Sequence, residues 1–308
     1  MPLHEQSTLS GGMVEKDTLY EGTHCWQHDI RLKNKSKDLK ALPFSKEEIS
    51  ALPVSKFEFR IAGKSSFDKV RRFIEKYEWL GRMSQYPTHL FTARYKDVLG
   101  GVVIMDMPTT FSKLVGENTR KMERLISRGA CASWTPKNLA SSLIMWSIKW
   151  MVKNTRYRIF SAYADPEARE LGTIYQACNF YYLGQRFGSK TKYENEDGRI
   201  VSDRYFRSRS VYKRLAKKMR IHWSRSWQKG DRIIWDNIPD DIESRLRNAS
   251  KEYLQSCKKI KCPKKHKYVY VCGRTKGETR RLRKIFEKEN KIFDYPKIRY
   301  GGDKDDDT

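Results

Sequence analysis

The sequence lacks any long apolar stretch. No run in its 308 residues approaches the roughly 18 apolar residues that a membrane-spanning helix needs. The amino terminus also lacks a charged region followed by an apolar stretch, so no secretory signal is expected. The six cysteines are scattered, which indicates reduced thiols and a cytoplasmic protein. We therefore expect no membrane partner.

Acidic residues are scarce relative to basic ones. The chain has 63 Lys and Arg against 37 Asp and Glu, a formal net charge of +26. Such an excess is typical of proteins that bind a polyanion, and nucleic acid is the first candidate. An anionic membrane surface is a weaker candidate. The alternative that the positive charge serves only solubility stays open.

The sequence also lacks a regular pattern of metal ligands. Residues 24–28 hold two histidines and a cysteine without a further ligand. Within residues 257–272, the spacing of the three cysteines and the histidine is irregular for a zinc site. Cys131, Cys178 and His89 would suit a nucleophile or a metal centre, but buried thiols and a strand histidine are the simpler interpretation. We predict no metal site from these residues.

Composition divides the chain into four parts. Residues 1–54 are polar with glycine and proline turn signals, which indicates an irregular, partly disordered arm. Residues 55–216 show regular apolar periodicity and form the expected main domain. Residues 217–300 are rich in Lys, Arg and Trp, which indicates a basic C-terminal subdomain. Residues 301–308 form an acidic tail.

Strands and helices alternate in the main domain. The predicted strands are 57–63, two within 89–105 around a turn near Lys96-Asp97, 121–133, 157–164, 180–187 and the start of 204–216. The predicted helices are 67–81, 137–154 and 171–178. This order predicts an α/β or α+β domain, with a mixed sheet and helices on both faces.

Residues 161–184 carry the clearest chemical signal. A strand ends at Asp165, a mostly polar loop follows, and a short helix begins at a Gly-Thr pair and carries Tyr175. A carboxylate at a strand end and a phenol in the next helix can converge on one cleft, which suits a transferase. A loop cap for Asp165 and a core position for Tyr175 stay open.

The element order resembles the GNAT acyltransferase fold. In that fold the strand-to-helix junction in mid-chain holds the donor phosphates, because a helix N-terminus offers free amides and a positive dipole end. Here the junction reads SRGACASWTPKNLASS, and we expect Ser133, Lys137 and Asn138 to contact substrate. It lacks the glycine-rich loop of GNAT enzymes. That absence argues against an acyl-coenzyme A-like donor, and the donor stays unidentified.

The stretches LISRGACASWTPKNLASSLIMWSIKWM and SAYADPEARELGTIYQACNFYYLG are similar to the Mom family of phage DNA-modification proteins, over roughly residues 57–216. The resemblance implies conversion of adenine in double-stranded DNA to N6-carbamoylmethyladenine, which shields phage DNA from restriction. It implies action in an infected or lysogenic bacterial host, and it allows an iron requirement. The Asp and Tyr of this family string, which are taken to be functional, fall on Asp165 and Tyr175.

A second site of the family, a His-Tyr pair after the first helix, has no histidine here. Glu78 and Trp79 occupy the corresponding place. An exocyclic adenine amine is a poor nucleophile, so we expect Asp165 or Glu78 to take its proton and Tyr175 to assist the leaving group. The base must leave the duplex stack, and Trp79 or Trp134 would stack on it. Core packing of Trp79 is the alternative.

The basic C-terminal region is expected to contact DNA. Trp223, Trp227 and Trp235 stand among cations, a pattern that suits stacking on bases, although a small apolar core would use the same residues. A short strand, 268–272, precedes a basic helix. Its expected phosphate contacts are Arg274, Lys276, Arg280, Arg281 and Arg283. A solvated helix face is the alternative.

Two other functions stay open at this point. One is a GNAT-type N-acyltransferase that acts on an amine of a protein, an RNA or a small molecule. The other is a non-catalytic DNA-binding protein with the same fold. We also expect removal of residues 217–308 to weaken DNA binding and to flatten its salt dependence.

Overall fold

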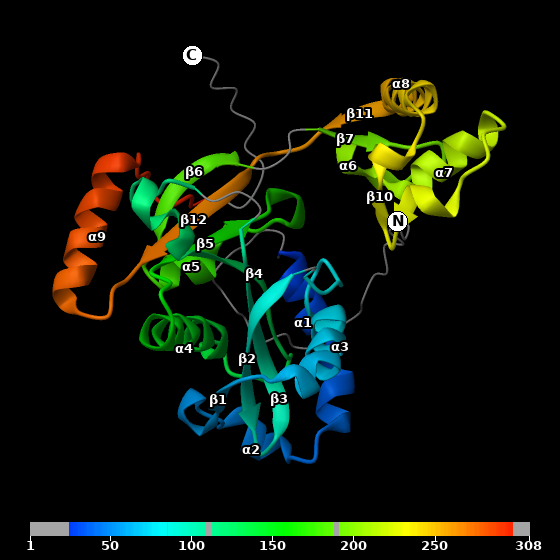
Figure 1. The fold of residues 1–308 in the computed structure, drawn as a ribbon. Helices are drawn as coiled ribbons and strands as arrows, with labels where there is room; N and C mark the ends of the chain where they lie inside the picture. Colours follow the sequence, from blue (N-terminus) through cyan, green and yellow to red (C-terminus); the bar gives the residue numbers. More distant parts are fainter. Residues whose placement is uncertain (1–24, 85, 109–111, 188–190, 298–308) are drawn as a thin grey trace.

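The computed structural model describes residues 25–84, 86–108, 112–187 and 191–297 (Figure 1). Its centre is a seven-stranded mixed sheet with the order β1-β2-β3-β4-β5-β12-β6. These strands are β1 (Glu58–Ile61), β2 (Pro87–Tyr95), β3 (Val98–Asp106), β4 (Glu123–Cys131), β5 (Ile159–Ala164), β6 (Tyr181–Phe187) and β12 (Lys265–Val271). β4 and β5 run parallel, and every other neighbouring pair is antiparallel. The predicted fold class is confirmed.

The predicted turn between β2 and β3 is present. Lys96 and Asp97 both have positive φ angles, 44° and 64°. Two successive residues in this region form the turn that matches the twist of a tight hairpin. β2 and β3 therefore pair along nearly their whole length.

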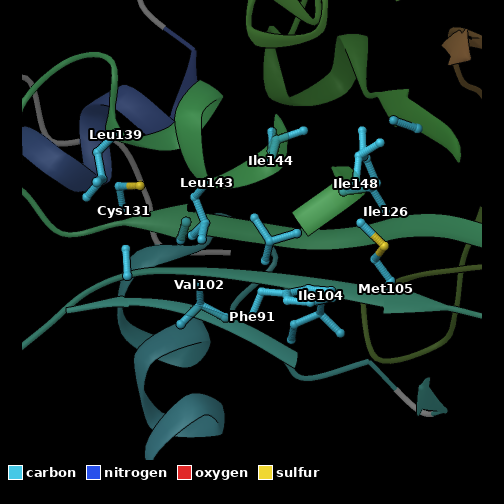
Figure 2. Close-up of a cluster of buried hydrophobic side chains, with 14 of the residues drawn as sticks. Phe91, Val102, Ile104, Met105, Ile126, Cys131, Leu139, Leu143, Ile144 and Ile148 are labelled. Carbon is cyan, nitrogen blue, oxygen red and sulfur yellow. The ribbon is translucent and has the colours of Figure 1, made fainter. Parts of the chain in front are cut away.

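Helices cover both faces of the sheet. On one side of β2–β4 lie α1 (Trp26–Ala41) and α3 (Phe67–Tyr77), and on the other lies α4 (Leu139–Asn154) (Figure 1). α3 buries side chains at helical spacing, as its apolar periodicity predicts. Figure 2 shows the α4 residues Leu143 and Ile148 over the sheet residues Val102 and Ile104, all fully buried.

Two further helices cover the β5-β12-β6 half of the sheet. α5 (Thr173–Ala177) packs on the face of Tyr268, whereas α9 (Lys276–Glu289) packs on the face of Val269 and Val271. Leu282 and Phe286 of α9 are buried there. Successive residues of a strand point to opposite faces, so β12 is covered on both sides.

The expected irregular arm is wrong for the part that the structure describes. α1 and the short α2 (Lys46–Ser50) occupy much of residues 25–54. α1 is fixed to the main domain by Asp38, which is buried, pairs with Lys76 at 2.7 Å and accepts a hydrogen bond from Ser133. The rest of the arm, residues 1–24, and the acidic tail lie outside the described residues.

The expected boundary at residue 217 is also wrong. β12 lies between β5 and β6, so the C-terminal region returns to the main sheet. Residues 191–261 are instead an insertion between β6 and β12, at the upper right of Figure 1. Its elements are β7 (Thr191–Glu194), β8 (Ile200–Val201), α6 (Asp203–Phe206), α7 (Arg209–Lys218), β9 (Gln228–Lys229), β10 (Arg232–Ile233), α8 (Asp240–Ser256) and β11 (Lys258–Lys261).

The insertion has its own small core. Val211, Tyr212 and Leu215 of α7 pack with Leu246 of α8. Their spacing is helical, and the strand expected at the start of 204–216 is therefore wrong. β7 and β11 pair antiparallel as a stalk that connects this core to the sheet, and β8 pairs with the other side of β7.

Candidate active site

A cleft of about 1040 Å³ opens where β4 and β5 end. Parallel neighbours place their carboxyl ends at one edge of a sheet, the usual position of ligand sites in open α/β sheets. The cleft is walled by the end of β4, the segment 163–177, the turn at 78–82 after α3, and the base of the insertion stalk. Asp165, Glu78 and Tyr175 all line it. Their catalytic roles stay a prediction.

Asp165 follows β5 directly and is buried. Its Oδ1 accepts a hydrogen bond from the Glu167 backbone N–H at 3.1 Å. Its Oδ2 pairs with Lys265 Nζ at 2.7 Å. Asp165 therefore caps the loop, one of the two interpretations open from the sequence, and it also faces the cleft.

Glu170 also lines the cleft, and sequence reasoning missed it. Its backbone N–H donates to the Asp165 carbonyl at 3.1 Å, and its Oε2 accepts from the Asp165 N–H at 3.1 Å. Burial, with added repulsion from Glu78 and Asp165, raises the pKa of Glu170 to about 7. In the sequence, only the position of Glu170, five residues after Asp165 in the same loop, could have pointed to it.

Glu78 ends α3 and enters the cleft from the opposite wall. Its Oε2 accepts from the Leu80 N–H at 2.9 Å. Burial raises the pKa of Glu78, although the charges of Arg128 and Arg82 act in the other direction. A carboxylate is therefore present at the position where the resemblance implies a histidine.

Tyr175 is half-buried in the middle of α5, with its ring against Phe180 and Tyr268. Burial and the nearby Glu170 raise the pKa of this phenol, so it stays protonated at neutral pH. Gly172 begins the helix with a φ of +72°, and a Cβ there would lie 2.4 Å from the Tyr268 ring. The close approach of Gly172 to Tyr268 fixes where α5 starts and hence where Tyr175 points.

The two tryptophans expected to stack on a base occupy different environments. Trp79 lines the cleft, and its ring meets Trp26 edge-on with centroids 5.6 Å apart. Trp134 is buried and stacks on Phe57, with centroids 5.8 Å apart. Since Trp134 is a core residue outside the cleft lining, the expectation that it stacks on substrate is corrected.

Of the three residues expected to contact substrate at the β4-to-α4 junction, two line the cleft and one does not. Lys137 and Asn138 line the cleft just before α4. The Ser133 hydroxyl instead donates to Asp38 of α1 and is not part of the cleft lining. Ser133 therefore connects the junction to α1, which corrects its expected role in substrate binding.

The cations of α9, and Arg274 just before this helix, lie away from this cleft. β12 runs antiparallel to β5, so Val271, just before α9, pairs with Ile159 at the far end of the strand from Asp165. Arg274 donates to the carbonyls of Val152 and Thr155 at the end of α4. A groove of about 750 Å³ there is lined by Arg274, Lys276, Arg280 and Arg283, among others. Arg281 is exposed.

Arg283 donates to the Val271 carbonyl at 3.0 Å. Arg274 and Arg283 therefore both have structural contacts, and phosphate binding by the α9 cations stays a prediction.

In the insertion, Trp223 and Trp227 meet edge-on with centroids 5.7 Å apart. Trp227 is buried, so it is a core residue rather than an accessible stacking surface.

A different set of cations surrounds the cleft, and sequence reasoning missed it. These side chains come from segments far apart in the chain, so no local run marks them. They are Arg31, Arg82, Arg128, Lys192, Arg204 and Lys265. Three of them, Lys192, Arg204 and Lys265, belong to the insertion or its junction with β12.

The described residues contain no group of three His, Cys, Asp or Glu side chains that could hold a metal ion. They therefore offer no ligand set that fits the iron allowed by the resemblance. Burial raises the pKa of Cys131 to about 12 and of Cys178 to about 11, so neither thiol is a ready nucleophile. No helix in the described segments combines the length and apolarity that a membrane crossing requires.

Several solved acetyltransferase structures have a similar arrangement at low identity. A probable acetyltransferase from Staphylococcus epidermidis ATCC 12228 is 11% identical with a TM-score of 0.34, over 47% of this chain and 93% of that one. An N-acetyltransferase from Staphylococcus aureus Mu50 is 16% identical with a TM-score of 0.31, over 45% and 87%. A Bacillus subtilis acetyltransferase in complex with CoA is 11% identical with a TM-score of 0.32, over 70% and 99%.

A search of curated proteins gave no match. The model of the Mom protein family, in contrast, matches residues 58–297. That span begins at β1, includes the whole insertion, and ends beyond α9. It therefore contains β12 as well as the segment with Asp165 and Tyr175, and the chain belongs to the Mom protein family.

Proposed function

We propose that this protein is a transferase that places a carbamoylmethyl group on the exocyclic nitrogen of adenine in double-stranded DNA. The observation that carries the proposal is the meeting of Asp165, Glu78 and Tyr175 in one cleft. These are the positions that the family resemblance marks. The resemblance supplies the identity of the transferred group and the biological role, protection of phage DNA from restriction.

The cleft suits the chemistry that this reaction needs. The adenine amine shares its lone pair with the ring, so a carboxylate that takes a proton as the new bond forms would lower the barrier. A phenol with a raised pKa stays protonated and can donate to a departing group. Tyr175 has this property and stands in the same cleft as the carboxylates.

The surroundings of the cleft suit a flipped base. A volume of about 1040 Å³ has room for a nucleobase and a donor group together. The ring of Trp79 lines the cleft and can stack on an extruded base. The cations Arg82 and Arg204 are exposed at the cleft, where the phosphates that flank a flipped nucleotide would come close.

Mass spectrometry of nucleosides tests the proposal. DNA from bacteria that express the wild-type chain should contain deoxyadenosine in which a carbamoylmethyl group replaces one hydrogen. DNA from cells with Tyr175→Phe should contain far less of it, and DNA with empty vector none. Unmodified deoxyadenosine with the wild-type chain would contradict the proposal, and an acylated protein or RNA in its place would favour an N-acyltransferase acting on another amine.

A further inference from the structure

We propose that Glu170 is the proton acceptor for the adenine amine, and that Asp165 is the positioning residue that holds it. This inference rests on the proposed function and assigns the base within the same cleft. It differs from the expectation drawn from the sequence, in which Asp165 or Glu78 takes the proton. The two carboxylates differ in how many of their oxygens already have hydrogen-bond partners.

Both oxygens of Asp165 have partners. Oδ1 accepts from the Glu167 N–H at 3.1 Å, and Oδ2 holds Lys265 Nζ at 2.7 Å. A charge-assisted bond to an ammonium group is among the stronger hydrogen bonds in proteins. A substrate proton would have to displace one of these partners, so Asp165 is poorly suited to accept it.

Glu170 has an oxygen to offer. Its Oε2 accepts from the Asp165 N–H at 3.1 Å. Within the residues that the structure describes, its Oε1 accepts no hydrogen bond. The side chain is half-buried and lines the cleft, so this oxygen can face a substrate. The Asp165 backbone thus holds the carboxylate at one oxygen and leaves the other for the reaction.

The charges around Glu170 support its role. Burial opposes its ionisation, and the negative charges of Glu78 and Asp165 oppose it further, whereas Lys265 favours it. The resulting pKa of about 7 is near the pH of a bacterial cytoplasm. A general base is most effective when its pKa lies near the working pH.

Glu78 is the competing base, and burial raises its pKa as well. The charges of Arg128 and Arg82 and the backbone N–H groups of Leu80 and Gly81 act against burial and favour its anion. Its own charge adds to the repulsion that raises the pKa of Glu170. We therefore assign Glu78 to the electrostatics of the cleft.

The transfer step then balances as follows for a donor that carries the carbamoylmethyl group on a leaving group. The adenine nitrogen forms a bond to the methylene carbon of the donor. The bond from that carbon to the leaving group breaks, and its electron pair departs with the leaving group. One proton of the amine moves to Glu170 Oε1. The Tyr175 hydroxyl donates a hydrogen bond to the leaving group.

Paired substitutions test the assignment in plasmid DNA from expressing cells, with the modified fraction of deoxyadenosine measured by mass spectrometry. Glu170→Gln should lower that fraction by a factor on the order of 100 or more. Asp165→Asn can still accept from the Glu167 N–H and should cost less than roughly tenfold. Glu75→Gln removes an exposed carboxylate one turn before Glu78 on α3 and should leave the fraction unchanged.

Each purified variant is also measured for binding to a labelled duplex and for its melting temperature, which separates loss of chemistry from loss of folding. A folded Glu170→Gln protein that binds DNA normally and modifies it nearly as well as wild type would overturn the inference. So would a larger loss in Glu78→Gln than in Glu170→Gln. A wild-type chain that leaves deoxyadenosine unmodified would instead overturn the proposed function, and the inference with it.

Discussion

The backbone N–H of Asp165 donates to the Glu170 carboxylate at 3.1 Å, and the N–H of Glu170 donates to the Asp165 carbonyl at the same distance. These reciprocal bonds close the loop after β5 into a ring. They hold the Glu170 side chain in the cleft beside Glu78 and Tyr175. One short loop thus positions two carboxylates, of which one is paired with Lys265 and the other lines the cleft.

The raised pKa of Glu170 predicts a dependence of stability on pH. The folded state binds this proton more tightly than the unfolded chain, whose carboxyl has a pKa of 4.5. The contribution of the side chain to stability is therefore greatest below pH 4.5 and is lost as the pH rises through about 7. A shift of this size corresponds to about 3 kcal/mol.

Glu170→Gln removes the ionisation, so the variant should melt at a higher temperature than wild type above pH 7, and the difference should shrink toward pH 4.5. Melting curves of both proteins across this range measure it. Glu75→Gln, at an exposed site, should follow wild type at every pH. A Glu170→Gln protein whose melting temperature differs from wild type by a constant amount would show that this carboxyl has no raised pKa.

Two glycines with nearly the same backbone angle allow a matched test of the packing under α5. Gly172 has a φ of +72° and Gly198 a φ of +71°, but only Gly172 faces a side chain, Tyr268, at close range. Gly198→Ala should cost about 1 kcal/mol from backbone strain alone. Gly172→Ala should cost about 1–3 kcal/mol more because its methyl group collides with the ring. Urea unfolding measures both, and equal losses would argue against this contact.

Trp79 and Trp134 should respond to alanine in opposite ways. Trp134→Ala empties a core site beside Phe57 and should lower the free energy of unfolding by about 3–5 kcal/mol. Trp79→Ala should leave stability nearly unchanged and weaken binding of a duplex with a mismatched adenine by about 1–3 kcal/mol, the usual value of one base stack. Denaturation and fluorescence anisotropy separate the two. A Trp79→Ala protein that binds such DNA like wild type would place the stacking elsewhere.

The position of the cations predicts which of them contact DNA. Arg82→Gln with Arg204→Gln, at the cleft, should reduce the slope of log Kd against log salt concentration, because each phosphate contact contributes about 0.9 to that slope. Lys276→Gln with Arg280→Gln removes the same charge from the groove beside α9 and should change the slope much less. If the α9 pair lowers the slope more, the DNA path follows the far end of the sheet.

The insertion can be removed without cutting the sheet. Glu194 of β7 and Lys258 of β11 are partners in the stalk, so an Asn-Gly turn can join them as a tight hairpin in place of residues 195–257. Because the core of the insertion is separate, the shortened chain should keep the cooperative unfolding of the main domain. Its DNA binding should weaken, since Arg204 is lost from the cleft. Loss of folding would show that the insertion supports the sheet.

Truncation at residue 217 would not test the same point. It would remove β12, which lies in the sheet between β5 and β6, and the remaining chain would lose its core. The sequence could not reveal this arrangement, because the short basic strand has no local signal for partners about 100 residues away. Apolar periodicity located α3, α4 and most strands of the main sheet, since those patterns depend on near neighbours.

The residues of the candidate site were also predicted from the sequence only in part. Asp165, Tyr175, Glu78 and Trp79 were found because family-like sequence surrounds them, and the structure places all four on one cleft. Glu170 was missed because its importance comes from a loop geometry and from burial. Trp134 was misplaced because an aromatic residue near a helix start looks the same in sequence whether it faces a cleft or the core.

The most direct test of this account is fragmentation mass spectrometry of deoxyadenosine from plasmid DNA in cells that express either the wild-type chain or Glu170→Gln. We expect a carbamoylmethyl group on the exocyclic nitrogen of the base with wild type, and its near absence with the variant. Deoxyadenosine of unchanged mass with the wild-type chain, or equal modification by both proteins, would contradict it.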